Sequence, residues 1–175
     1  SEMCIRDRIT RAPTVLSLVK NAGFTAVRRS QMKTEEDIIQ HPEVIVLDTI
    51  GELGRVYSLA DVVFVGGSFV KVGGHNILEP AAHGKPVLVG PHMFNFRDIF
   101  DLLSRRGACI MTGNEKEFEK TLFRLLEDPE KIEQMGTAAL EVVRENQGGT
   151  RRNIDLFEKL ANKYNIQLME NSHES

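Results

Sequence analysis

Short apolar runs alternate with longer amphipathic segments along most of this chain, and this alternation limits the fold more than any other feature. The spacing predicts strands over residues 24–27, 43–47, 62–65, 87–89 and 108–111. It predicts helices over residues 13–22, 53–60, 76–83, 96–106, 116–126, 129–145 and 150–164. Strands this short and continuously apolar are typical of a parallel sheet with helices on both faces. Because strand–helix–strand connections are right-handed, the pattern predicts a Rossmann-like α/β fold.

The length of 175 residues is sufficient for one domain of this kind. We expect the domain to cover residues 13–164, with residues 1–12 as a segment outside it and residues 165–175 as a polar tail. Apolar runs such as Val62–Val65 are far shorter than the roughly 18 residues that a membrane-spanning helix requires. We recognise no secretory signal either.

The charge balance and the reactive side chains exclude several classes of protein. With 22 Lys+Arg against 25 Asp+Glu the formal charge is -3, so we expect no nucleic-acid partner. The two cysteines, Cys4 and Cys109, lack a C-x-x-C spacing and predict neither a disulfide framework nor a zinc ribbon. The irregular spacing of His75, His83 and His92 predicts no metal site. We therefore expect a reducing, cytoplasmic setting.

Polar and glycine-rich segments follow three of the predicted strands. They are Asp48–Leu53, Gly66–Asn76 and Gly90–Asn95. In doubly wound sheets, ligands bind beyond the carboxyl ends of the strands, and these ends lie on one edge. The sequence therefore predicts a ligand site at this edge.

The loop Gly66–Asn76 (GGSFVKVGGHN) is the most informative of the three segments. It does not have the spacing of G-x-G-x-x-G, of G-x-x-x-x-G-K-[ST] or of G-x-S-x-G, which argues against dinucleotide, P-loop and hydrolase sites. Its four glycines would let backbone amides approach an anion, next to the start of the helix predicted near Asn76. The alternative is a pair of tight turns that need glycine at positive φ.

Several polar side chains near this loop have two possible roles. Glu79 either caps the helix, by accepting from the Asn76 amide, or binds the hydroxyl groups of a ribose. His75 is a candidate ligand for a phosphate or a sugar. Asp48 and Glu52 flank a turn, where carboxylates commonly form local hydrogen bonds. The aromatic pair in Phe94-Asn-Phe96 is more typical of core packing than of base stacking, and Arg151 and Arg152 are candidates for docking or phosphate binding.

Five stretches combine into a more specific pattern. They are Asp48–Leu53, Ala60–Asp61, Gly66–Ala82, Gly84–Val87 and Gly90–Phe96. With them, the chain resembles the 3-deoxy-D-manno-octulosonic acid (Kdo) transferases over about residues 13–157. That family has the GT-B fold, in which two Rossmann-like domains enclose the active site. The resemblance implies that this chain is the carboxyl-terminal half, which binds the donor CMP-Kdo.

The resemblance implies a donor nucleotide-sugar site in this chain and a catalytic base outside it, in the amino-terminal half. Glu79 would hold the ribose, residues 73–76 would face the phosphate and the sugar, and the turn at 50–52 would border the nucleobase. The implied donor-binding residues are Ile50, Gly51, Glu52, Gly66, Gly67, Ser68, Gly73, Gly74, His75, Asn76 and Glu79. No metal and no cofactor are implied.

The implied reaction is the inverting transfer of Kdo from CMP-Kdo to a lipid A precursor, in lipopolysaccharide biosynthesis. The acceptor and the membrane would be reached only through the amino-terminal half. The full-length enzyme would then act at the cytoplasmic face of the bacterial inner membrane, while this chain alone would be inactive. Two alternatives stay open: the donor domain of another GT-B enzyme that uses a UDP-sugar, and a non-catalytic nucleotide-binding module.

Overall fold

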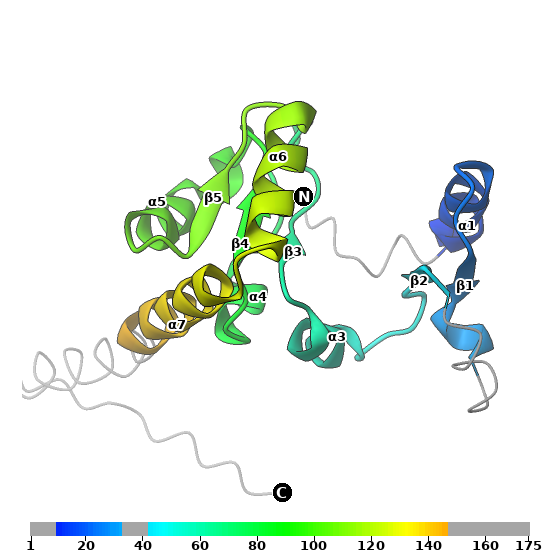
Figure 1. The fold of residues 1–175 in the computed structure, drawn as a ribbon, viewed down its shortest axis with the longest axis horizontal. Coiled ribbons are helices and arrows are strands. Elements are labelled where there is room, and N and C mark those ends of the chain that lie inside the picture. The colour runs from blue at the N-terminus through cyan, green and yellow to red at the C-terminus, as the bar shows by residue number, and fades with distance from the viewer. Residues whose placement is uncertain (1–9, 33–41, 147–175) are drawn as a thin grey trace, which may run out of the picture. The chain divides into compact units, whose positions relative to one another are not determined.

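The computed structural model describes residues 10–32 and 42–146, in two compact units that divide between residues 59 and 60 (Figure 1). The helix predicted over residues 150–164, the tail and the arginines at 151 and 152 lie outside the described residues. Most of the predicted segment 1–12 lies outside them as well.

Among its described residues, the first unit contains a pair of parallel strands, two α-helices and the short 3-10 helix η2 (Arg29–Gln31). Its elements are α1 (Ala12–Asn21), β1 (Ala26–Arg28), β2 (Val44–Val46) and α3 (Leu53–Leu59). β1 and β2 pair in parallel, with Ala26 opposite Val44, and α1 packs against both strands. The prediction that the 43–47 run forms a buried strand is wrong in part, because Ile45 is 51% exposed. Alternate residues of a strand face opposite sides, and Val44 and Val46 are half-buried.

The second unit contains a three-stranded parallel sheet and four α-helices among its described residues. Its elements are β3 (Val63–Phe64), α4 (Leu78–Ala82), β4 (Val87–Val89), α5 (Arg97–Arg105), β5 (Cys109–Met111), α6 (Glu115–Leu126) and α7 (Pro129–Asn146). The strand order is β3-β4-β5, with Val63 opposite Val87 and Val87 opposite Cys109. Each strand is followed by a helix, as predicted.

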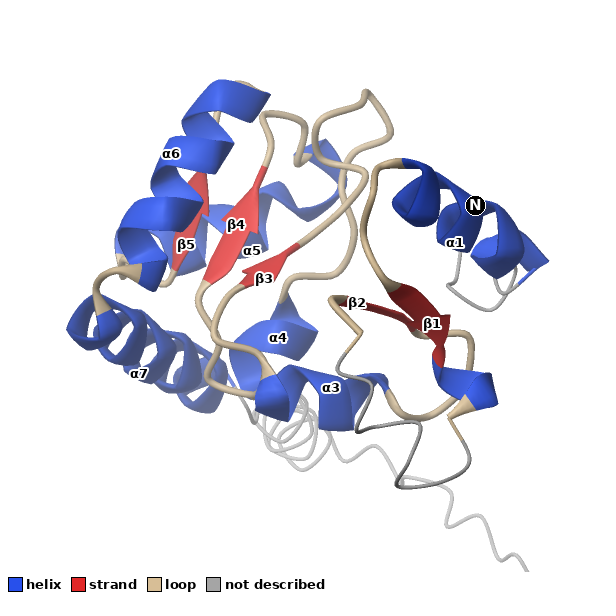
Figure 2. Cartoon of the chain, turned by 45° about the vertical axis from the view of Figure 1, so that its right-hand side comes forward, coloured by secondary structure: helices blue, strands red, loops and turns tan. Residues whose placement is uncertain are grey.

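Alternate side chains of the central strand β4 enter two separate apolar clusters. Val87 and Val89 pack with residues of α4, α5 and α7, whereas Leu88 packs with residues of α6 and α7. All three side chains are fully buried. β4 and β5 accordingly lie between α5 and α6 in Figure 1, and α5 lies behind β4 in Figure 2. The predicted parallel sheet with helices on both faces is confirmed in this unit.

Two helix starts differ from the sequence expectation for a local reason. α4 begins at Leu78 rather than near residue 76, because the Asn76 side-chain oxygen accepts from the Leu78 N–H at 3.0 Å. α6 begins at Glu115 after the N-cap Asn114, whose side chain accepts from the Glu117 N–H at 3.0 Å. In both cases an asparagine side chain satisfies a backbone donor of the first turn.

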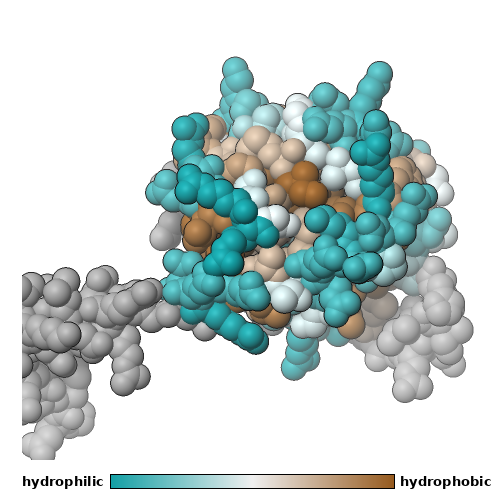
Figure 3. Space-filling view, turned by 60° about the vertical axis from the view of Figure 1, so that its left-hand side comes forward, coloured by the Kyte–Doolittle hydropathy of each residue, from teal (hydrophilic) through white to brown (hydrophobic). Residues whose placement is uncertain are grey.

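Over the described ranges, no helix combines the length and the apolar character needed to cross a membrane. Apolar surface on the face drawn in Figure 3 is bordered by hydrophilic side chains.

Candidate functional site

Three glycines of the loop between β3 and α4 have a left-handed backbone conformation. Gly67, Gly73 and Gly74 have φ values of +72°, +92° and +76°, a region that residues with a side chain rarely adopt. The Gly74 N–H donates to the Gly67 carbonyl at 3.1 Å and closes the loop on itself. The tight-turn interpretation is therefore correct for these glycines, and the Gly74 amide is already occupied by the loop.

The same glycines allow the loop to pack closely against the segment that follows β4. A Cβ on Gly74 would collide with the Met93 sulfur, and one on Gly73 would collide with the Asn95 side chain. Asn95 also donates from its backbone N–H to the Gly73 carbonyl at 3.2 Å, and from its Nδ2 to the Val72 carbonyl at 3.0 Å. Residues 90–96 thus fix the shape of the glycine loop.

The segment Gly90–Asn95 was expected at the ligand edge, but Asn95 itself was not singled out as a site residue. The core packing expected of the aromatic pair is wrong for Phe94, which is 55% exposed, whereas Phe96 packs against the larger apolar cluster.

Ser68 joins the two loops and is fully buried. Its hydroxyl donates to the Val65 carbonyl at 2.6 Å and accepts from the Gly90 N–H at 2.8 Å. Its carbonyl accepts from the His92 N–H at 2.9 Å. The Ser68 hydroxyl thus holds the glycine loop against the 90–96 segment.

The remaining polar residues of the loop lie nearer to solvent. Asn76 and Glu79 are exposed, and His75 is half-buried with its Nδ1 2.8 Å from the Gly66 carbonyl oxygen. The Glu79 carboxylate lies 3.5 Å from the Asn76 side-chain amide, and no side chain caps α4 at its N-cap residue, Ile77. The capping role considered for Glu79 is therefore not what the structure shows.

The turn at residues 50–52 belongs to the first unit. Gly51 has φ +86°, and Ile50 is 70% exposed. Glu52 accepts from the Thr49 hydroxyl and from Arg29 Nη2, the latter at 3.0 Å. The hydrogen bond from Thr49 and the Arg29 guanidinium lower the pKa of Glu52. Glu52 is thus an ionised group that holds its own turn.

Asp48 forms a similar local contact in the first unit. It accepts from the Ser30 N–H at 2.8 Å and from the Ser30 hydroxyl at 2.7 Å. Burial acts against ionisation, but these hydrogen bonds outweigh it and lower the pKa of Asp48. The local hydrogen bonding expected for Asp48 and Glu52 is confirmed.

With this geometry described, the chain can be compared with known proteins. The family model described as "Glycosyl transferases group 1" matches residues 29–142. This chain belongs to the group 1 glycosyl transferases. The matched range contains every residue of the predicted site, both the turn at 50–52 and the loop from Gly66 to Glu79.

Relatives of this glycosyl transferase chain confirm the resemblance to the Kdo transferases. It is 40% identical over 148 residues to the 3-deoxy-D-manno-octulosonic acid transferase of Haemophilus influenzae, covering 84% of this chain and 34% of the relative. It is 37% identical over 137 residues to the enzyme of that name from Bordetella pertussis, covering 78% and 32%. The chain spans about a third of the length of these curated relatives.

A solved structure confirms the fold class of this glycosyl transferase chain. The C-terminal CMP-Kdo binding domain of WaaA from Acinetobacter baumannii matches it with a TM-score of 0.69 at 32% identity. The match covers 77% of this chain and 69% of that domain.

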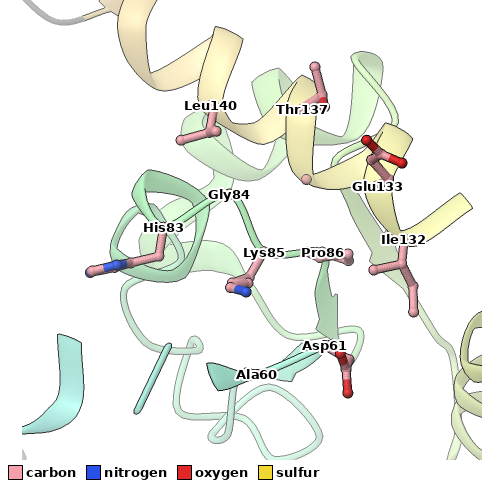
Figure 4. A pocket seen from close by; sticks show the side chains of 11 residues that line it. Ala60, Asp61, His83, Gly84, Lys85, Pro86, Ile132, Glu133, Thr137 and Leu140 are labelled. Carbon is pink, nitrogen blue, oxygen red and sulfur yellow. The ribbon is translucent and has the colours of Figure 1, made fainter. Parts of the chain in front are cut away.

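A hollow of about 290 Å³ lies at the opposite edge of the glycosyl transferase's second unit (Figure 4). Its lining residues include Asp61, just before β3, and Pro86, just before β4. The face of α7 around Gly136 also lines it. The side chains of Asp61 and Glu133 point away from one another in Figure 4. They do not converge on a common point, so this hollow offers less for a ligand than the glycine loop.

Among the described residues, neither the Cys109 thiol nor a cluster of metal-binding side chains provides a second reactive site. Burial raises the pKa of the Cys109 thiol to about 12, so the thiol stays protonated and unreactive. Among residues 10–32 and 42–146, no three His, Cys, Asp or Glu side chains gather as a metal site would require.

Proposed function

We propose that this chain is the donor-binding part of a glycosyltransferase that uses CMP-Kdo. The observation that carries the proposal is the glycine loop, which Ser68 and Asn95 hold in one shape at the carboxyl edge of a parallel sheet. This is the edge at which nucleotides bind in such folds. The similar solved domain is described as a CMP-Kdo binding domain, which supports this choice of donor.

Within that site, each group has a role that its position permits. The exposed Glu79 carboxylate accepts hydrogen bonds from the ribose hydroxyls, because among the described residues only a weak contact to Asn76 occupies it. The segment from Gly73 to Asn76 faces the phosphate and the sugar. Ser68 and Asn95 contribute by positioning the loop.

The complete reaction requires more than this chain. The hydroxyl of a lipid A precursor attacks the anomeric carbon of CMP-Kdo with inversion and forms the new C–O bond. A glutamate of the amino-terminal part takes the hydroxyl proton, and the bond from the anomeric carbon to the phosphate oxygen breaks to release CMP. The full-length enzyme carries out this step of lipopolysaccharide biosynthesis at the cytoplasmic face of the inner membrane.

Nucleotide preference is the direct test of the donor. We expect the chain to bind CMP more tightly than UMP or AMP in isothermal titration calorimetry. Chemical-shift mapping with CMP should perturb the amides of Gly74, His75 and Asn76. Equal or tighter binding of UMP would favour a UDP-sugar donor, and shifts confined to the hollow around Pro86 would place the nucleotide at the wrong edge.

The role of Glu79 can be tested by one substitution with a matched control. Glu79→Gln should weaken CMP binding by about 1–3 kcal/mol, the range for a hydrogen bond to a charged group. Glu133→Gln makes the same change on an exposed residue of α7, at the hollow, and should leave the affinity unchanged. Calorimetry on both variants measures the difference in affinity. Unchanged CMP binding by Glu79→Gln would contradict the role of Glu79 in binding the ribose.

A further inference from the structure

His75 is held in one orientation by the glycine loop. Its Nδ1 lies 2.8 Å from the Gly66 carbonyl oxygen, and a Cβ on Gly67 would come within 2.6 Å of Nδ1 and Cε1. Because a carbonyl oxygen only accepts hydrogen bonds, Nδ1 carries the hydrogen in this contact. The neutral ring therefore keeps a bare lone pair on Nε2.

The state of Nε2 decides which ligand group His75 can contact. A bare Nε2 accepts from a hydroxyl group, whereas phosphate oxygens offer it no donor. Contact with a phosphate would require the protonated ring, in which both nitrogens donate. Among the described residues, no carboxylate lies within 4.0 Å of a His75 ring nitrogen.

The other charged or titratable side chains of the contacting segments are few. Lys71 lies in the same loop, Glu79 lies in α4, and His92 lies in the segment after β4. Lys71 and Glu79 are exposed, and His92 is half-buried. Within the described part of the chain, none of the three forms a hydrogen bond or ion pair with His75.

We infer that His75 accepts a hydrogen bond from a hydroxyl group of the bound nucleotide sugar and does not bind its phosphate. The inference rests on the proposed function, because it concerns the same ligand. The hydroxyl belongs either to the ribose or to the transferred sugar, and both present the same chemistry to Nε2.

The test compares wild type with His75→Asn by calorimetry at pH 8, using CMP, 2′,3′-dideoxy-CMP and CMP-Kdo. The asparagine amide nitrogen takes about the place of Nδ1, so the contact to Gly66 is retained while the acceptor at Nε2 is lost. The variant should bind about three- to tenfold more weakly wherever the ligand supplies the hydroxyl.

The ligands distinguish the two sources of the hydroxyl. A loss seen with CMP and absent with the dideoxy nucleotide assigns the ribose, whereas a loss seen only with CMP-Kdo assigns the transferred sugar. His75→Gln, whose amide oxygen reaches the place of Nε2, should recover part of the affinity. His83→Asn repeats the substitution at the opposite edge and should change nothing.

Two results would overturn the inference. A loss of equal size with CMP and with 2′,3′-dideoxy-CMP would mean that His75 contacts the phosphate or has a structural role alone. Unchanged affinity for all three ligands would mean no contact. If wild type binds neither CMP nor CMP-Kdo, the proposed function itself is wrong.

Discussion

Gly74→Ala is expected to destabilise the second unit by about 1–3 kcal/mol more than Gly107→Ala, and to weaken CMP binding at least tenfold. Both glycines have left-handed backbone, at φ +76° and +73°, so alanine carries a similar backbone strain at each. At Gly74 the new methyl group would also collide with the buried Met93 sulfur, whereas at Gly107 no described residue beyond the chain neighbours lies within 4 Å of the Cβ position. The comparison therefore isolates the steric effect.

Urea unfolding followed by circular dichroism measures the stability difference, since the chain has no tryptophan for fluorescence. Calorimetry with CMP measures the affinity under native conditions. Equal stability of the two variants would mean that the loop adapts to the methyl group at little cost. Equal CMP affinity would mean that the ligand does not depend on the shape of this loop.

The second large effect concerns turnover. The chain alone should form no detectable product from CMP-Kdo and a lipid A precursor, because the resemblance places the catalytic base in the amino-terminal half. A general base commonly contributes about a hundredfold to ten-thousandfold in rate, and acceptor positioning contributes further. A fusion that joins the amino-terminal part of the Haemophilus influenzae relative to this chain should restore transfer. Thin-layer or mass-spectrometric detection of the extended lipid provides the measurement.

The same fusion carrying Glu79→Gln should retain the product but require more CMP-Kdo, which separates donor binding from chemistry. Product from the chain alone would show that a base lies within these 175 residues. A fusion that binds CMP without forming product would contradict the assignment of the reaction while leaving the donor site in place.

The sheet and most helices of the second unit were predictable because their signals are local. β4 is a continuous apolar run, and α6 is an amphipathic segment whose end at Leu126 was predicted and whose start was placed one residue late. The partners of Ser68 and Asn95 were not predictable. Each side chain bonds to a backbone group 22 or 23 residues away, and backbone groups leave no pattern in the sequence. The start of α4 was misplaced for a similar reason, because the sequence does not show which atom the Asn76 side chain contacts.

The joining of the glycine loop to the segment after β4 has a consequence for the thermodynamics of binding. Four hydrogen bonds between the two, from Gly90, His92 and twice from Asn95, order both loops before any ligand arrives. The two loops then lose most of their conformational entropy during folding, and they lose little more when a ligand binds. Restricting one loop also restricts the other, so a nucleotide that touches only the first should slow amide hydrogen exchange in both.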